Sequence, residues 1–226
     1  MSRRSMTKAR LAKAVASLAA ASAILPVLTG CGDSDAEAHH SHEIQIDDVS
    51  VSAMSPQARI SDLAEANAVA HVESMSPGDR LSIYAFGKSL TSACVPIDIT
   101  FPEENSEGQD QLRNDLVGTL PSLLSQYVSC VRDPSVGGSS DSGSPIFGAI
   151  HEAMESSGGA SVTAIRLITD GCSFGEGVDT CVRDMTDVDF AQNLVERMPE
   201  AMKPRLNGIT LTVVGLGHGT EMSGSQ

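Results

Sequence analysis

Three oxygen-bearing side chains near the start of the chain stand at alternate positions. Asp48, Ser50 and Ser52 lie in the sequence "DVSVS", directly after the alternating stretch "EIQID". Successive side chains of an extended segment point to opposite sides, so these three can point the same way. One carboxylate and two hydroxyls are the hard oxygen ligands that Mg²⁺ takes in proteins. The spacing therefore indicates part of a magnesium site, against the alternative of polar loop sequence in a serine-rich chain.

Two more oxygen side chains occur at the ends of later elements. Ser144 stands before Pro145 at a predicted helix start, and Asp170 follows the apolar run "AIRLIT" in a Thr169-Asp170-Gly171 triplet. Each has a local explanation, since serine before proline caps a helix and T-D-G is an ordinary turn. The order of the three motifs along one domain favours a shared metal site.

Strand and helix patterns alternate through the domain that must position these residues. The strands are expected at 44–46, 80–87, 93–101, 161–171 and 208–217, and the helices from Pro56 to about Met75, around Leu112–Tyr127, from Pro145 past Met154, and after a capping box at 186–189. This alternation predicts an α/β fold with a doubly wound, mostly parallel sheet and helices on both faces. Ligands bind such sheets beyond the carboxyl ends of the strands, where the winding reverses. We therefore expect Asp48 and Asp170 on one edge of the sheet.

The residues within these predicted strands and helices predict further details of the fold. The first strand alternates apolar and polar residues, whereas a central parallel strand normally reads as an apolar run. Pro121 is expected to kink or split its helix, and Pro96 indicates an edge strand. The first helix is expected to bury one side, formed by Ile60, Leu63, Ala66, Val69 and Val72.

Residues 1–30 are typical of an export signal and are excluded from the fold. A basic start precedes the apolar run "AVASLAAASAILPVL", which is too short for a comfortable membrane span. It ends in "LTGC", which resembles the bacterial lipobox. This implies lipidation of Cys31 and anchoring to the extracytoplasmic face of a membrane, against an ordinary secretory signal with an incidental cysteine. Both the general secretory and the twin-arginine export routes remain open.

A polar tether is expected over 31–43, between the lipid and the domain. Its histidines, His39, His40 and His42, suit a solvated linker better than a transition-metal site.

The charge balance excludes one class of partner. All 29 acidic residues follow Cys31 and five of the 15 basic ones precede it, which leaves 10 basic against 29 acidic residues, a formal charge of −19. Such a chain is not expected to bind nucleic acid. About 195 residues suffice for one domain, and its core must be aliphatic, since tryptophan is absent.

Four cysteines follow the signal: Cys94, Cys130, Cys172 and Cys181. An even count in an exported chain favours disulfides. Three pairings are possible, and we favour Cys172–Cys181 as a local clamp with Cys94–Cys130 as the remainder. A zinc site is the rival interpretation, and the absence of C-x-x-C spacing argues against it.

Together, "DVSVS", "GSPI" and "TDG" in this order resemble the von Willebrand factor A domain with its metal-ion-dependent adhesion site. "MSPGDRLSIYAFG" and "GITLTVVGLGHG" resemble further strands of that family, so the likeness covers residues 44–219, followed by a tail at 220–226. The family normally continues into a last helix where this chain ends in "GTEMSGSQ". The resemblance therefore implies this Rossmann-like fold without that helix.

The resemblance also implies roles for the five oxygen side chains. Ser50, Ser52 and Ser144 would bind Mg²⁺, or Mn²⁺ or Ca²⁺, directly, while Asp48 and Asp170 would act directly or through water. The remaining position would take a carboxylate from a protein partner. The implied function is a lipid-anchored adhesion or interaction module and not an enzyme.

Three alternatives stay open. Ser144 replaces the family's usual threonine and Val51 a common glycine, which leaves room for a scaffold of this fold without a working metal site. A serine hydrolase would use Ser144 with His151 or His218 and Asp170, although the chain contains no G-x-S-x-G motif. A solute-binding lipoprotein would normally be larger and two-lobed.

Overall fold

A computed structural model describes residues 40–87, 93–103, 108–136, 145–157, 162–172, 174–175, 178–179, 192–193, 196–200 and 203–216. All of them belong to one compact unit, Ala38–Gln226. Its main sheet has five strands: β1 (His42–Asp48), β2 (Arg80–Phe86), β3 (Ile97–Thr100), β4 (Ala164–Ile168) and β7 (Thr210–Val214). The described helices are α1 (Ile60–Ser74), α2 (Gln109–Arg132), α3 (Ile146–Ser156) and the short 3-10 helix η1 (Pro134–Val136). A separate two-stranded sheet pairs β5 (Phe174–Gly175) with β6 (Val178–Asp179).

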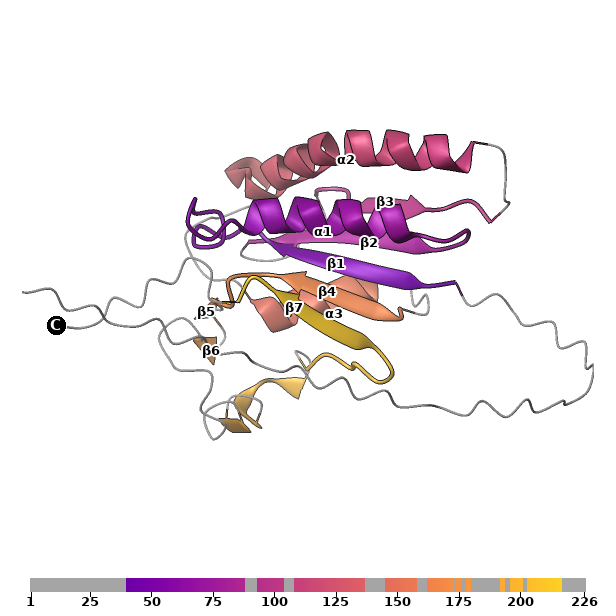
Figure 1. The fold of residues 1–226 in the computed structure, drawn as a ribbon. Coiled ribbons are helices and arrows are strands. Elements are labelled where there is room, and N and C mark those ends of the chain that lie inside the picture. Colours follow the sequence, from indigo (N-terminus) through magenta and orange to yellow (C-terminus); the bar gives the residue numbers. More distant parts are fainter. Residues whose placement is uncertain are drawn as a thin grey trace, which may run out of the picture. The chain divides into compact units, whose positions relative to one another are not determined.

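The strands of the main sheet lie in the order β3-β2-β1-β4-β7 (Figure 1). β1 is parallel to both β2 and β4, and β4 is parallel to β7. β3 pairs antiparallel with β2 at the edge, where Pro96 predicted an edge strand. The chain winds outward from β1 to β3 and then resumes at β4 on the other side of β1. The winding therefore reverses between β1 and β4, and the α/β class with a mostly parallel sheet is confirmed.

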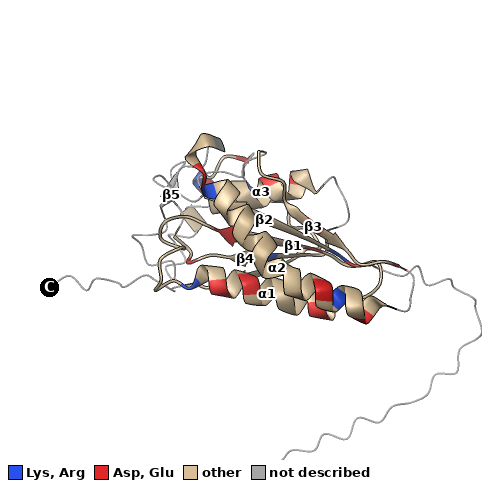
Figure 2. Cartoon of the chain, turned by 90° about the horizontal axis from the view of Figure 1, so that it is seen from above, with Lys and Arg blue, Asp and Glu red and all other residues tan. Residues whose placement is uncertain are grey.

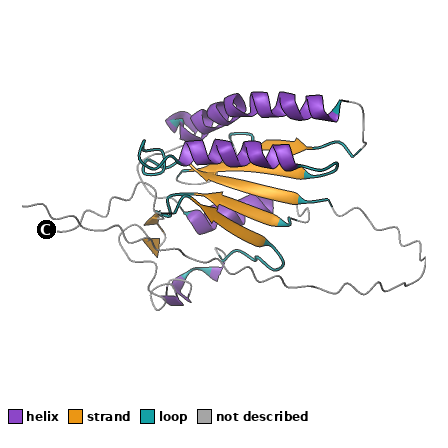
Figure 3. Ribbon diagram, in the orientation of Figure 1, coloured by secondary structure: helices purple, strands orange, loops and turns teal. Residues whose placement is uncertain are grey.

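Helices cover both faces of this sheet (Figure 3). α1 and α2 pack together on one face, and their apolar residues meet β2 and β3 around Leu81, Ile83 and Phe101. α3 covers the other face, where Ile146 and Ile150 pack against the aliphatic residues of β1 and β4. The core is thus aliphatic with few aromatic rings, as the composition predicted.

The alternating strand β1 is the central one, and all seven of its residues are buried. Its two isoleucines face α3. Its other face carries Glu43, Gln45 and Asp47 toward the α1 side, and the Gln45 amide donates to the Ala64 carbonyl of α1 at 3.0 Å. The expectation that a central strand must be an apolar run is wrong here, because hydrogen bonds and an ion pair hold polar residues of one face against α1 and β4.

Glu43 anchors this polar row. It accepts a 2.8 Å hydrogen bond from Arg166 of β4, and His71 of α1 lies 3.3 Å from its other oxygen. Arg166 also donates to Asn67 of α1 at 2.8 Å. Burial favours a higher pKa for Glu43, but the contacts with His71 and Arg166 outweigh it and lower the pKa below its ordinary value. Polar bonds therefore hold part of α1 on the sheet.

Helix α1 departs from its predicted start and buried side. It begins at Ile60, because the residues before it form turns and Arg59 has a left-handed φ of 53°. It ends at Ser74, as predicted. Its fully buried stripe is Ile60, Ala64, Ala68 and Val72, whereas Ala66 is exposed and Leu63 and Val69 are half-buried. Helix α2 is not split at Pro121, because it runs as one helix from Gln109 to Arg132.

One predicted disulfide is confirmed. Cys94 and Cys130 are bonded with Cα atoms 5.9 Å apart, which ties the loop before β3 to the last turn of α2. Cys172 is also disulfide-bonded. Its expected partner, Cys181, lies outside the described residues.

Some expectations fall at the borders of the described chain. β1 begins at His42, so His42 and Glu43 belong to the sheet and not to the tether expected over 31–43. His42 is buried, with its Nε2 3.0 Å from Ser82 Oγ. The signal segment, His39, Cys31 and the capping box at 186–189 lie outside the described residues. Among the described helices, none is long and apolar enough to cross a membrane.

The polar row leads to a stability prediction. Replacing Glu43→Gln leaves the partly buried Arg166 without its carboxylate, and we expect the free energy of unfolding at pH 7 to fall by about 3 kcal/mol. Because the pKa of Glu43 is lowered, this contribution exists above the ordinary glutamate pKa and disappears as the pH falls through the lowered value. Urea unfolding of both proteins at pH 7 and pH 3 measures it. Glu73→Gln, on the exposed side of α1, is the matched control, and equal midpoints for all three proteins at pH 7 would contradict the prediction.

Candidate metal site at the ends of β1 and β4

Asp48 and Asp170 lie at the edge of the sheet where its winding reverses. The last paired residues of β1 and β4 are Asp47 and Ile168, so Asp48 and Thr169 follow side by side. The Thr169 hydroxyl donates to Asp48 Oδ2 at 2.7 Å. The charge of Asp170, the residue after Thr169, adds to the rise in the pKa of Asp48. The sequence prediction that both residues share one edge of the sheet is confirmed.

The loop after β1 brings two hydroxyls to this edge. The Ser50 N–H donates to Asp48 Oδ1 at 3.0 Å, which turns the chain back over the carboxylate. The Ser50 and Ser52 hydroxyl oxygens lie 3.2 Å apart. Asp48 and Ser50 are buried, while Val51 and Ser52 are exposed. The D-x-S-x-S residues thus lie together, although in a turn and not along a continued strand.

The loop after β4 has its own tight turn. The Cys172 N–H donates to Asp170 Oδ1 at 2.8 Å, and the Gly171 N–H donates to the Thr169 hydroxyl at 3.1 Å. Gly171 adopts a φ of 84°, which a residue with a side chain rarely takes. Asp170 is buried. The turn therefore fixes the Asp170 carboxylate at the end of β4.

The surroundings of this edge disfavour the ionised forms of its carboxyl groups. Burial raises the pKa of Asp48 to about 6, and the charge of Asp170 adds to it, while hydrogen bonds from Ser50 and Thr169 oppose the rise. Burial also raises the pKa of the neighbouring Asp47 to about 7, against a hydrogen bond from Gln45 and with the charge of Asp48 adding. Positive charge placed at Asp48 and Asp170 would relieve this repulsion.

These residues fit a hard dication in chemistry. They offer two carboxylates and two hydroxyls, and Ser144, expected as a further ligand, lies outside the described residues. In the described part of the chain, no group of three His, Cys, Asp or Glu side chains could hold a metal ion. A metal site here would therefore need serine oxygens as ligands in addition to the two carboxylates.

Sequence reasoning missed the role of Thr169. The register of parallel β1 and β4 puts it opposite Asp48, so the pairing of the two strands would have revealed it. Asp47 was also missed as a site residue, because it read as part of an anomalous alternation. Of the residues considered for a hydrolase, His151 lies half-buried on α3, while Ser144 and His218 lie outside the described residues.

Comparisons with known proteins add little to this picture. No family model matches the chain, and no curated protein matches it. A solved structure of proximal thread matrix protein 1 from the mussel byssus matches 77% of this chain at 14% sequence identity, with a TM-score of 0.38. The match covers 37% of that protein, so this chain spans well under half of its length. A likeness at this level carries no argument about function.

The raised pKa of Asp48 predicts how stability depends on pH without metal. The folded protein binds this proton more tightly than the unfolded chain, so stability falls as the pH rises from about 4 through 6, by about 3 kcal/mol for Asp48. Asp48→Asn keeps the shape and removes the charge, so its profile should be flatter. Urea unfolding in EDTA from pH 4 to pH 8 measures it.

The chain offers a matched control. The exposed Asp133 accepts the same kind of bond from the Ser135 N–H, at 2.8 Å, but its pKa is lowered. Asp133→Asn should leave the pH profile of the wild type unchanged in this range. Parallel profiles for wild type and Asp48→Asn would contradict the prediction.

Proposed function

We propose that this chain is a protein-binding module of the von Willebrand factor A type that depends on a divalent ion. The observation that carries the proposal is that Asp48 and Asp170 follow the ends of the paired strands β1 and β4 at the switch point, with two serine hydroxyls in the loop after Asp48. Doubly wound sheets bind ligands at this position. The strand order β3-β2-β1-β4-β7, with an antiparallel edge strand, is compatible with the same fold type.

In this proposal the serine hydroxyls of Ser50, Ser52 and Ser144 hold Mg²⁺, or Mn²⁺ or Ca²⁺, directly. Asp48 and Asp170 act directly or through water. The ion supplies positive charge on a strongly acidic domain, and an anionic partner can then approach. A protein partner that offers a carboxylate would complete the coordination. The module binds and performs no catalysis.

A scaffold of the same fold without a working metal site is the second candidate. One observation favours it: both oxygens of Asp48 already accept hydrogen bonds, from the Ser50 N–H and from the Thr169 hydroxyl. A metal ion would have to displace or share at least one of these bonds. The two candidates differ in whether the protein binds divalent ions at all.

Calorimetry with MgCl₂ and MnCl₂ on the purified full-length chain separates these candidates. We expect binding heat from the wild type and none from Asp48→Ala or Ser52→Ala, because both remove an oxygen ligand. A hundredfold excess of metal over its Kd should also raise the free energy of unfolding by about 2.7 kcal/mol. Asp133→Ala, which removes an exposed carboxylate, is the control. Equal, negligible heats from all proteins would leave the scaffold.

We further propose that the chain is exported and anchored through a lipid on Cys31. The support is the order of basic start, apolar run and "LTGC" in the sequence. Cys31→Ser should move the protein from the membrane fraction to the soluble fraction of cells that express the full chain, and the mass of the wild type should include acyl groups. Ser34→Ala, beyond the cleavage position, is the control. A wild type found in the soluble fraction without added mass would refute the anchor.

A further inference from the structure

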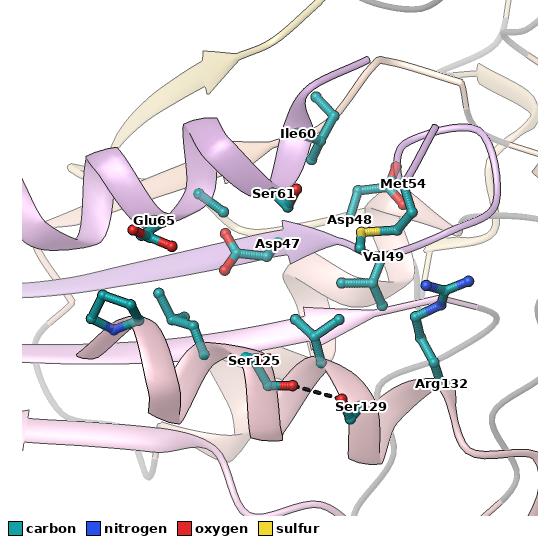
Figure 4. Close-up of a pocket in the computed structure, with 14 residues that line it drawn as sticks. Asp47, Asp48, Val49, Met54, Ile60, Ser61, Glu65, Ser125, Ser129 and Arg132 are labelled. Carbon is teal, nitrogen blue, oxygen red and sulfur yellow. Dashed lines mark hydrogen bonds between the residues drawn. The ribbon is translucent and has the colours of Figure 1, made fainter. Parts of the chain in front are cut away.

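A cavity of about 360 Å³ opens between α1 and α2, on the opposite side of β1 from α3. Its floor contains the Asp47 carboxylate, and Figure 4 shows this group directed between the two helices. Its walls include the apolar side chains of Met54, Ile60, Leu124 and Val128. A volume of this size lies in the range of small-molecule sites.

The Asp47 carboxylate has few partners for a buried charge. It is 2% exposed, and both of its oxygens accept from the same Gln45 amide group, at 2.9 and 3.2 Å. Across the described residues, neither another hydrogen bond nor an ion pair reaches it. An ionised carboxylate offers about four acceptor positions, so much of its capacity remains toward the cavity. A buried carboxyl group with one neutral donor is stabilised in its ionised form by a cationic donor that can enter.

Polar and charged side chains line the mouth of the cavity. Ser61 and Glu65 of α1 and Ser125 and Ser129 of α2 line it and are exposed. Figure 4 shows Glu65 at one end and Arg132 at the other, and Arg132 is exposed on the last turn of α2. Figure 2 shows acidic residues along the length of α1. The Glu65 end of the mouth is therefore the one that favours the approach of a cation.

The geometry points to a binding site for a small primary alkylammonium ion, with its ammonium group on Asp47 and its alkyl chain between α1 and α2. The apolar walls suit a short alkyl chain and are unsuited to a bare metal ion, which needs several oxygen ligands. An anion is disfavoured because the carboxylates of Asp47, Asp48 and Glu65 line the cavity against one guanidinium group, that of Arg132. The serine hydroxyls of the proposed metal site do not line this cavity, although Asp48 does.

The probe is n-butylammonium chloride, titrated into the full-length chain by calorimetry in EDTA. We expect binding by the wild type, with 1-butanol at least tenfold weaker because it lacks the charge. Asp47→Asn keeps an acceptor for Gln45 and should weaken n-butylammonium about tenfold to hundredfold. Asp62→Asn, on the exposed side of α1, should leave the affinity unchanged. Circular dichroism checks that each variant is folded.

Three results would overturn the site: no binding of n-butylammonium by the wild type, equal affinity for 1-butanol, or equal affinity in Asp47→Asn. The comparison with 1-butanol needs only the wild type, so it holds even if a variant fails to fold. Ser52→Ala separates this site from the proposed function. It should lose the heat of metal binding and retain the heat of n-butylammonium binding.

Discussion

The buried polar row on the central strand determines how one face of this domain is built. Glu43, Gln45 and Asp47 lie beneath α1, where an apolar row would normally hold the helix. Glu43 is linked to β4 and α1 through Arg166 and His71, and Gln45 bonds the main chain of α1. Such bonds are directional, so they set the position of the helix along the strand more narrowly than apolar contact would. The small buried residues Ala64 and Ala68 let the helix approach the sheet.

The polar row ends at Asp47, and Asp48 follows directly in the chain. These two adjacent carboxyl groups have different surroundings. Asp47 faces the cavity between α1 and α2, and Asp48 receives bonds from Ser50 and Thr169 at the switch point of the sheet. Burial raises the pKa of both, and each charge disfavours the other. Two neighbouring positions on one strand therefore both supply an acidic group to the cavity, and the second of them also lies at the switch point. A change in charge at one position must affect the other.

Sequence reasoning predicted the sheet and the edge that carries the acidic residues, because the β and α patterns alternate and the motifs follow the strands. It failed where tertiary contacts override local pattern. The alternation of β1 argued against a central strand until the partners of Glu43 and Gln45 were known. The helix predicted from Pro56 begins only at Ile60, because turns precede it and Arg59 is left-handed. Thr169 could be assigned a role only from the register of two strands far apart in sequence.

The position of β1 also has a mechanical consequence. It is the first of the described strands, and it forms parallel hydrogen-bond ladders with β2 along one edge and with β4 along the other. A force applied through the chain before His42 would act along the axis of this strand and load both ladders in shear. The bonds of the two ladders would then share the load and would have to break together, unlike those of an edge strand peeled away one bond at a time. A domain pulled from its N-terminal end would thus resist extension through its most buried strand.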